Sequence, residues 1–290
     1  IMALNKIDIT DQQWATFDRD GYVVLKKVIN SSTLTSLQSR IDAIMQGTAD
    51  VPYDKLMMQL DSPDQKYANT GEQTMGFKGP TLDYRKIQNL DEDKIWMDYM
   101  RAPLFDEACK RIYGTETPIT SFRCMFFNKP AGKGTPLPWH QDRWQYLTKD
   151  PLLTVWSALD DATEATGCVY VIPGSHKLGV VNRDHHSSFL TDQNVIDYCG
   201  EEKVAKLEME AGDIALLHNW TIHRSGVNNS PNPRRAYSVN YMPADTVALC
   251  HEFEVASAKP SDLKQGGETM GKGSVLAPGG MSFPLIFDRK

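Results

Sequence analysis

The tetrapeptide Trp139-His140-Gln141-Asp142 contains the residues whose types and spacing best suit chemistry. It follows residues 130–138, a stretch interrupted by glycine and proline. In an extended segment His140 and Asp142 would project from the same face, because side chains alternate along a strand. An imidazole and a carboxylate are two parts of the facial triad that binds non-haem Fe(II) and leaves coordination positions open. Taken alone, the triplet is a weak signal, since the same pattern also arises in surface turns.

A second histidine has to complete such a metal site. His223 is the best candidate, because it lies where a hydrophobic run ends at the turn formed by residues 224–226. His218 precedes it along the chain and is the competing third ligand if the register of the strands differs. The combination of His140, Asp142 and His223 therefore predicts a metal centre assembled from two distant segments.

Two adjacent arginines, Arg234 and Arg235, follow an Asn- and Pro-rich loop and precede a strand-like segment at 236–240. A 2-oxo acid that chelates a metal with one end needs a fixed cation for its far carboxylate, and arginine is the planar bidentate donor. One of the two side chains is therefore a candidate for that role. The alternative is a solvated strand end, which is the ordinary setting of paired charges.

The composition of the chain restricts the classes of function. Of its 290 residues 41% are hydrophobic and 23% charged, as in an ordinary globular protein with a substantial core. A net charge of −6 argues against a nucleic-acid-binding protein, which needs a concentrated basic surface. No apolar run reaches the ~20 residues that cross a bilayer, so we expect no membrane partner. An N-terminus without an apolar signal segment and five cysteines without a C-x-x-C pair indicate a cytoplasmic protein. The sequence leaves the oligomeric state open between a monomer and a homodimer.

The hydrophobic pattern predicts helices and many short strands. Helices are expected at 12–19, 30–45, 91–100 and 103–113, the first with Thr10 as its N-cap. Strands are expected at 22–25, 55–60, 81–89, 119–128, 152–159, 168–172, 206–208, 214–217 and 235–242. Short strands separated by turn residues indicate a sandwich or jelly roll. We therefore expect a mainly β fold with flanking helices, in which an N-terminal helical layer supports a double sheet.

The chain is expected to form a single domain over residues 1–290. Helical support would occupy about 8–113 and the jelly-roll core about 114–255. Residues 180–200 show no clear β pattern and are interpreted as a lid-like insert, because long loops in compact domains are often functional. Residues 256–290 are rich in glycine and are expected to form a tail over the surface.

Further motifs are distributed over most of the chain, from Asp18 to Met242. They comprise residues 18–25, His140-Gln141-Asp142, Trp156, and residues 167–177, 222–226 and 234–236. Together these motifs resemble the phytanoyl-CoA dioxygenase family, whose members are Fe(II)/2-oxoglutarate-dependent oxygenases. The resemblance implies a double-stranded β-helix, a cupin-like jelly roll, with Fe(II) as cofactor and 2-oxoglutarate and O₂ as co-substrates.

The resemblance also implies roles for individual residues, beginning with His140, Asp142 and His223 as iron ligands. Arg234 matches the arginine that binds the distal carboxylate of 2-oxoglutarate, and Arg235 falls one position away. Three more positions match residues around that co-substrate: Ser225 beside the distal carboxylate, Trp156 in the pocket wall and Asn128 at the chelating end.

The substrate pocket is expected beside the predicted metal-binding pair. Arg143, Trp144 and Tyr146 follow that pair directly, so we expect them at the edge of a pocket for a small-molecule substrate. Packing at the rim of the pocket is the alternative role for Trp144.

The family's reaction couples oxidation of a substrate C–H bond by O₂ to conversion of 2-oxoglutarate into succinate and CO₂. Halogenases of this family carry a small residue in place of the carboxylate ligand, so Asp142 favours hydroxylation or another oxidation. Two other classes are considered: a catalytically silent metal-binding jelly-roll protein, and a zinc-dependent hydrolase or isomerase of cupin type. The intact ligand set argues against the first, and Arg234 and Ser225 would lack a purpose in the second.

Overall fold

The computed structural model describes residues 4–183, 188–249 and 281–289. Its α-helices are α1 (Asp11–Asp20), α2 (Ser31–Met45), α3 (Lys94–Met100), α4 (Pro103–Tyr113) and α5 (Asp192–Tyr198). Short 3₁₀ turns lie at Tyr53–Lys55, Tyr67–Asn69, Leu90–Glu92, Ser175–Leu178 and Glu201–Lys203. Among the described residues, none of the helices combines the length and apolar character needed to cross a bilayer.

Helix α1 begins and ends as its sequence predicts. The Thr10 side chain accepts a hydrogen bond from the backbone N–H of Gln13, and the Gln13 side chain accepts one from the N–H of Thr10, which forms a capping box. The helix ends at Gly21, whose φ of 81° is readily adopted only by glycine. The predicted N-cap at Thr10 is therefore confirmed.

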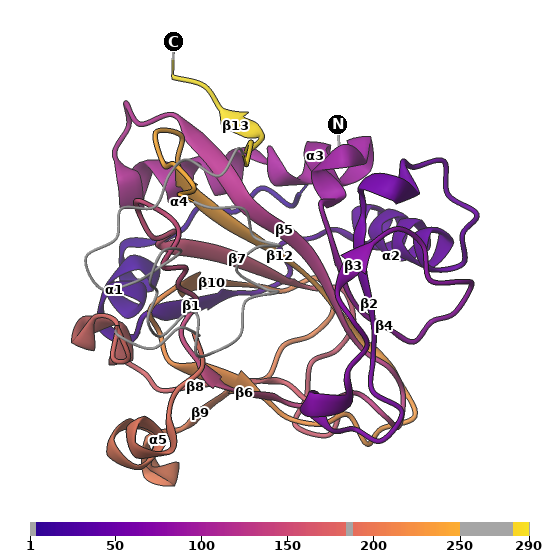
Figure 1. Ribbon diagram of the computed structural model, residues 1–290. Helices are drawn as coiled ribbons and strands as arrows, with labels where there is room; N and C mark the ends of the chain where they lie inside the picture. Colours follow the sequence, from indigo (N-terminus) through magenta and orange to yellow (C-terminus); the bar gives the residue numbers. More distant parts are fainter. Residues whose placement is uncertain (1–3, 184–187, 250–280, 290) are drawn as a thin grey trace.

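The strands form two antiparallel sheets that lie opposite each other (Figure 1). The large sheet has the order β1 (Tyr22–Leu25), β10 (Ile214–His218), β7 (Leu153–Ala158), β12 (Arg234–Pro243), β5 (Ile119–Lys129), β4 (Tyr84–Gln88), β2 (Met57–Leu60) and β3 (Thr74–Met75), and β13 (Leu285–Phe287) also pairs with β5. The small sheet has the order β6 (Leu137–His140), β11 (His223–Ser225), β8 (Val169–Val171) and β9 (Ala205–Leu207). The predicted mainly β jelly roll with flanking helices is confirmed.

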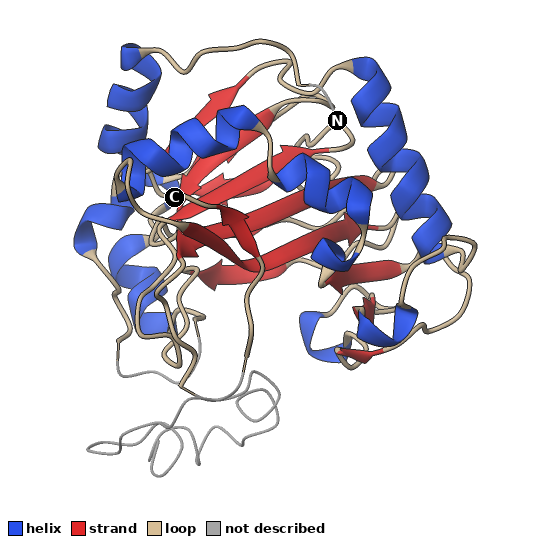
Figure 2. Ribbon diagram, turned by 90° about the horizontal axis from the view of Figure 1, so that it is seen from above, coloured by secondary structure: helices blue, strands red, loops and turns tan. Residues whose placement is uncertain are grey.

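Helices cover the outer face of the large sheet (Figure 2). The Trp96 ring of α3 lies 4.4 Å from the Tyr237 ring of β12, measured between centroids. The Tyr99 hydroxyl, also in α3, is hydrogen-bonded to the Ser157 hydroxyl of β7 at 2.7 Å. Burial of this face between helices and sheet fixes the strands from outside, so their opposite face is turned towards the small sheet.

The N-terminal part of the chain is less purely helical than the predicted supporting layer. Between residues 8 and 113 the structure also contains β1, β2, β3 and β4, all of which belong to the large sheet. Three of these were expected as strands, but their membership in the main sheet depends on pairing with β5 and β10, far along the chain.

The predicted insert and tail are described only in part. Residues 184–187 and 250–280 lie outside the described residues. Within 180–200, a segment expected to be irregular, the structure has helix α5, which begins with a capping box at Thr191. The end of the chain is not only a tail, because β13 pairs with β5 of the large sheet. Closure of the insert as a lid stays a prediction.

Candidate metal centre

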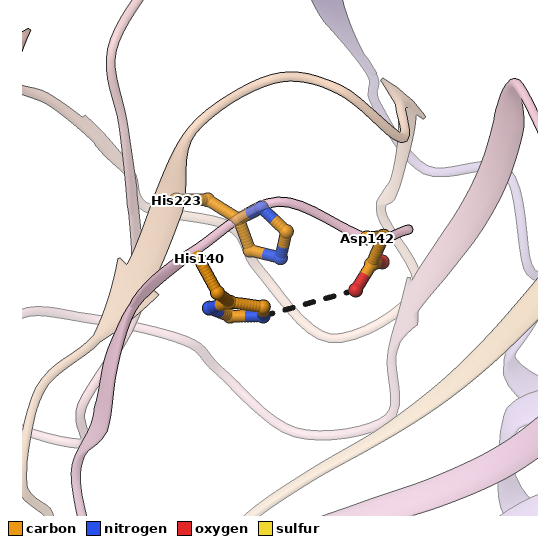
Figure 3. Close-up of side chains that lie close together, drawn as sticks. All are labelled: His140, Asp142 and His223. Atoms are coloured by element: carbon orange, nitrogen blue, oxygen red, sulfur yellow. Dashed lines mark ion pairs between the residues drawn. The ribbon is translucent and has the colours of Figure 1, made fainter. Parts of the chain in front are cut away.

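Two neighbouring strands of the small sheet bring the predicted metal ligands together. His140 ends β6 and His223 begins β11, and the two residues are directly paired in the antiparallel register. Asp142 follows just beyond the end of β6. One ligand atom from each of the three side chains can be chosen so that all lie within 4.8 Å of one another. Figure 3 shows both imidazoles and the carboxylate pointing towards the same space.

Backbone carbonyl groups orient both imidazole rings. Nδ1 of His140 donates to the Pro138 carbonyl at 2.8 Å, and Nδ1 of His223 donates to the Thr221 carbonyl at 2.9 Å. Because a carbonyl can only accept, Nδ1 carries a proton in each ring, which leaves Nε2 as the nitrogen available for coordination. Nε2 of His140 lies 3.8 Å from Oδ1 of Asp142. The Nε2 atoms and the carboxylate therefore face a common point, as metal coordination requires.

Burial also keeps the first imidazole neutral. The pKa of His140 lies well below its ordinary value because the ring is desolvated and because His223 is close, with 4.1 Å between ring centroids. A metal ligand has to be unprotonated at nitrogen, so this environment favours the binding form of the ring.

Residues around the ligands fix the turn after β6. Gln141 points away from the centre, and its side-chain amide donates to the carbonyls of Gly179 and Trp220 at 2.8 and 2.6 Å. The Asp142 N–H donates to the Asn219 carbonyl at 2.8 Å. These bonds hold His140 and Asp142 on one side of the chain, which is the alternation expected from the sequence.

His218 is not part of this group. It ends β10 in the large sheet, and its ring lies 5.1 Å from the ring of His176, measured between centroids. Its Nδ1 accepts the N–H of Trp220 at 3.1 Å. The geometry therefore favours His223 over His218 as the third ligand.

A cavity between the sheets contains the metal site and most of the predicted co-substrate residues. His140, Asp142 and His223 line it together with other side chains from both sheets, among them Asn128, Trp156, Ser225 and Arg234. The remaining wall is largely apolar, with Met125, Phe127, Leu137, Val169, Leu207 and Leu217. Such a wall reduces the access of water to the centre and strengthens electrostatic interactions within it.

Strand alternation separates the two adjacent arginines. Arg234 is buried on the inner face of β12, where its guanidinium carbon lies 5.5 Å from the centroid of the Trp156 ring. One of its amino groups donates to the Gly167 carbonyl at 3.1 Å, and its Nε has no hydrogen-bond partner. Arg235 points outward and forms ion pairs with Asp160 at 2.8 Å and Asp42 at 2.6 Å. The inner position belongs to Arg234, as the family resemblance implied.

Arg234 is buried without an acidic partner, and this environment changes the pKa of its guanidinium. Desolvation lowers the pKa of its guanidinium to about 10, and no ion pair joins it to an acid among the described residues. Buried charges are normally paired, so an unpaired guanidinium in a cavity fits a carboxylate supplied by a ligand. Together, two imidazoles, a carboxylate and a distant arginine fit Fe(II) and a 2-oxo diacid.

Ser225 and Asn128 differ in how well they match their expected roles. Ser225 lies two residues after His223 on β11 and is buried in the cavity wall. The Asn128 amide nitrogen already donates to the carbonyls of Leu82 and Tyr84, both at 2.9 Å. Its carbonyl oxygen has no partner, so contact of Asn128 with the chelating end of a co-substrate stays a prediction.

The three residues predicted at the substrate pocket do not line the metal cavity. An amino group of Arg143 donates to the Asn182 carbonyl at 2.8 Å. The rings of Trp144 and Phe122 lie 4.5 Å apart, and Tyr146 is buried in the same apolar cluster. These side chains therefore pack beside other residues, outside the lining of the metal cavity. Their contact with substrate stays a prediction.

Arg85 and Lys129 were missed from the sequence, although both line the cavity. Lys129 pairs with Arg234 in the register of β5 and β12, a relation that strand alternation could have indicated had the predicted strand not ended at 128. Arg85 lies in β4, next to an irregularity in its pairing with β2. Such an irregularity changes the face of a side chain and leaves no mark in the hydrophobic pattern.

Comparison with known proteins agrees with this geometry. The family model described as phytanoyl-CoA dioxygenase (PhyH) matches residues 17–236, which include the three candidate ligands and Arg234. A phytanoyl-CoA dioxygenase domain-containing protein 1 homolog of Dictyostelium discoideum is 34% identical over 286 residues, covering 87% of this chain and 98% of that protein. The peroxisomal phytanoyl-CoA dioxygenase of Homo sapiens is 24% identical and covers 89% and 74%, respectively.

Solved structures show the same fold at lower identity. The carbocyclase SnoK from nogalamycin biosynthesis, a non-heme alpha ketoglutarate dependent enzyme, matches with a TM-score of 0.64 and 17% identity over 97% of both chains. EctD from S. alaskensis, solved with 2-oxoglutarate and 5-hydroxyectoine, gives a TM-score of 0.64 and 18% identity over 94% of this chain and 88% of that chain. The family match confirms the expected reaction class, an iron- and 2-oxoglutarate-dependent dioxygenase. The chain belongs to the phytanoyl-CoA dioxygenase family.

Proposed function

We propose that this enzyme hydroxylates an unactivated C–H bond of a small molecule, with His140, Asp142 and His223 as the Fe(II) ligands and Arg234 as the anchor of 2-oxoglutarate. The observation that carries the proposal is the arrangement of side chains in one cavity. The three potential metal ligands lie together, and the buried guanidinium of Arg234, which has no acidic partner among the described residues, lies elsewhere in the cavity wall. A 2-oxo diacid has a chelating end and a carboxylate end, and this cavity offers a partner for each.

The side chains divide the tasks of binding and orientation. Arg234 and the Ser225 hydroxyl hold the distal carboxylate, and the Trp156 ring limits the width of the pocket beside the guanidinium. When bound, the iron and 2-oxoglutarate supply the oxidising chemistry, in which O₂ is consumed, succinate and CO₂ are formed and an oxygen atom enters the substrate. The backbone carbonyls behind His140 and His223 keep both imidazoles turned towards the metal throughout.

The carboxylate of Asp142 supports hydroxylation over halogenation. A halide needs the coordination position that a carboxylate ligand occupies, and Asp142 is present beside the two imidazoles. The substrate is proposed to be a small molecule. EctD, for example, was solved with 5-hydroxyectoine. A cytoplasmic location is likewise proposed from the sequence, while several relatives are named as peroxisomal enzymes.

Succinate formation tests the proposed reaction. The metal-free protein is loaded with Fe(II) or with Zn(II), supplied with 2-oxoglutarate and a panel of small metabolites, and sampled with and without O₂. We expect succinate only with Fe(II) and O₂, and none from the His140→Ala variant. Turnover of a substrate with Zn(II), or full activity of His140→Ala, would refute the assignment in favour of zinc chemistry or of other ligands.

A further inference from the structure

The cavity contains more positive charge than the neighbouring acids balance. Arg85, Lys129 and Arg234 all line it and are only 9%, 4% and 3% exposed. None of the three forms an ion pair with a carboxylate within the described part of the chain. The charge of Asp61 acts on all three, but its oxygens already accept hydrogen bonds from the Ser62 N–H and from Thr135. Buried cations without such a partner are unfavourable, so the site favours an anion from outside.

Lys129 is the cation placed directly beside Arg234. The two residues are paired in the antiparallel register of β5 and β12, and side chains opposite each other in a sheet project from the same face. Arg85 comes from β4, and its guanidinium donates to the side chain of Gln59 at 3.0 Å and lies over the Tyr67 ring. Register therefore selects Lys129 as the neighbour of the anchoring guanidinium.

Two glycines make room for the lysine side chain. A Cβ on Gly134 would lie 2.5 Å from Cβ of Lys129, and a Cβ on Gly167 would lie 2.8 Å from its Cδ. Gly167 also supplies the carbonyl that accepts from Arg234. The close approach of both loops encloses the lysine stem in protein, so its buried position is built into the packing of the site.

The ammonium group retains unused hydrogen-bonding capacity. Among the described residues its one hydrogen bond is donated to the Thr135 carbonyl. An ammonium has three donors, which leaves two for a ligand. Burial and the nearby guanidinium groups of Arg234 and Arg85 lower the pKa of Lys129 well below its ordinary value. The carboxylate of a bound ligand would offset the effects of burial and of the neighbouring guanidinium groups, because it supplies a negative charge beside the ammonium.

We propose that Lys129 is a second binding residue for the distal carboxylate of 2-oxoglutarate, acting beside Arg234. This inference rests on the proposed function. Arg234 offers a planar pair of donors and Lys129 a compact point charge, so one carboxylate accepts from both without competition for the same geometry.

Binding measured without turnover tests the role of Lys129. The Fe(II)-loaded protein is titrated by calorimetry, with O₂ excluded, with 2-oxoglutarate and with 2-oxopentanoate, which has a methyl group in place of the distal carboxylate. For Lys129→Met we expect affinity for 2-oxoglutarate to fall about tenfold to about 100-fold, the value of one charged hydrogen bond. Affinity for 2-oxopentanoate should change less than about twofold, since the lost partner is absent there.

Lys133→Met is the matched control. Lys133 lies near Lys129 in sequence, but its side chain is 42% exposed and paired with Asp83, and it does not line the cavity. This variant should bind both acids as the wild type does. Equal weakening of both acids in Lys129→Met, or no weakening of either, would overturn the inference.

A stability measurement separates binding from packing. Without ligands, Lys129→Met should melt no lower than the wild type, because the substitution removes an unpaired buried cation and keeps an unbranched stem. A lower melting temperature together with unchanged discrimination between the two acids would show a structural role only. If the wild type itself fails to bind 2-oxoglutarate, the proposed function fails. If Arg234→Met loses discrimination and Lys129→Met keeps it, this inference alone fails.

Discussion

Replacing Arg234 with methionine should weaken binding of 2-oxoglutarate far more than it weakens the fold. The guanidinium is 3% exposed, so little solvent screens its interaction with a carboxylate. Loss of one partner from a buried ion pair costs about 3–5 kcal/mol, which corresponds to about a 150-fold to 4,000-fold rise in the dissociation constant. The folded apo protein has no acid paired with Arg234 among its described residues, so its unfolding free energy should change little.

Replacing the adjacent Arg235 with methionine should have the opposite effect: it should weaken the fold more than it weakens binding of 2-oxoglutarate. Its side chain is 14% exposed and bonds to Asp160 and Asp42 on the outer face of the sheet. Loss of these bonds should lower the free energy of unfolding by about 1–3 kcal/mol, because the poorly exposed Asp160 loses its charged partner and keeps only neutral donors. Affinity for 2-oxoglutarate should stay within about twofold of the wild type, since Arg235 does not line the cavity.

The assay combines calorimetric titration of both Fe(II)-loaded variants, with O₂ excluded, and urea unfolding of the metal-free proteins. A larger loss of 2-oxoglutarate affinity in Arg235→Met than in Arg234→Met would refute the assignment of the inner face. Equal losses of affinity in both would show that net charge, rather than direct contact, governs binding.

Three other changes have defined outcomes. Asp142→Ala should weaken Mn(II) binding at least about 100-fold, measured by paramagnetic resonance of free Mn(II); retained affinity would remove Asp142 from the ligand set. Gly167→Ala should lower the free energy of unfolding by about 2 kcal/mol, since φ is 81° and the new Cβ would meet the Gly226 and Val227 carbonyls at 2.8 Å; an unchanged urea midpoint would contradict this. Burial lowers the pKa of His218 in the folded protein to about 4, whereas the pKa in the unfolded chain is about 6.5. The contribution of His218 to the free energy of unfolding is therefore complete above pH ~6.5 and falls by about 3 kcal/mol towards pH 4, because the unfolded chain takes up the proton first. His218→Gln should flatten that decline of unfolding free energy with falling pH, and an equally steep decline would show that other groups cause it.

The sequence was most informative where local pattern determines structure. The run Tyr22–Leu25 and the helix Pro103–Tyr113 have the predicted bounds, because turn residues limit both segments. Alternation along a strand was enough to place His140 and Asp142 on one side. The choice of Arg234 over Arg235 came from the family resemblance, and the structure gives its physical reason in the register with Lys129.

Long-range packing accounts for what could not be predicted. Pairing of Leu285 with Thr120 makes the end of the chain a strand, and no local signal shows that partner. Arg143 and Trp144 were chosen for their nearness to Asp142 in sequence. In the structure Arg143 bonds to the Asn182 carbonyl and other residues line the metal cavity, so contact of the two with substrate stays a prediction. The accumulation of buried cations depends on three strands meeting, and each strand alone contributes one ordinary charged residue.

A crystal structure of the Fe(II) complex with 2-oxoglutarate, grown without O₂, tests the central claim most directly. The account predicts a metal bonded to Nε2 of His140, Nε2 of His223 and a carboxylate oxygen of Asp142, with the far end of 2-oxoglutarate on Arg234. A metal bound elsewhere, or a diacid whose far carboxylate lies away from Arg234, would contradict it.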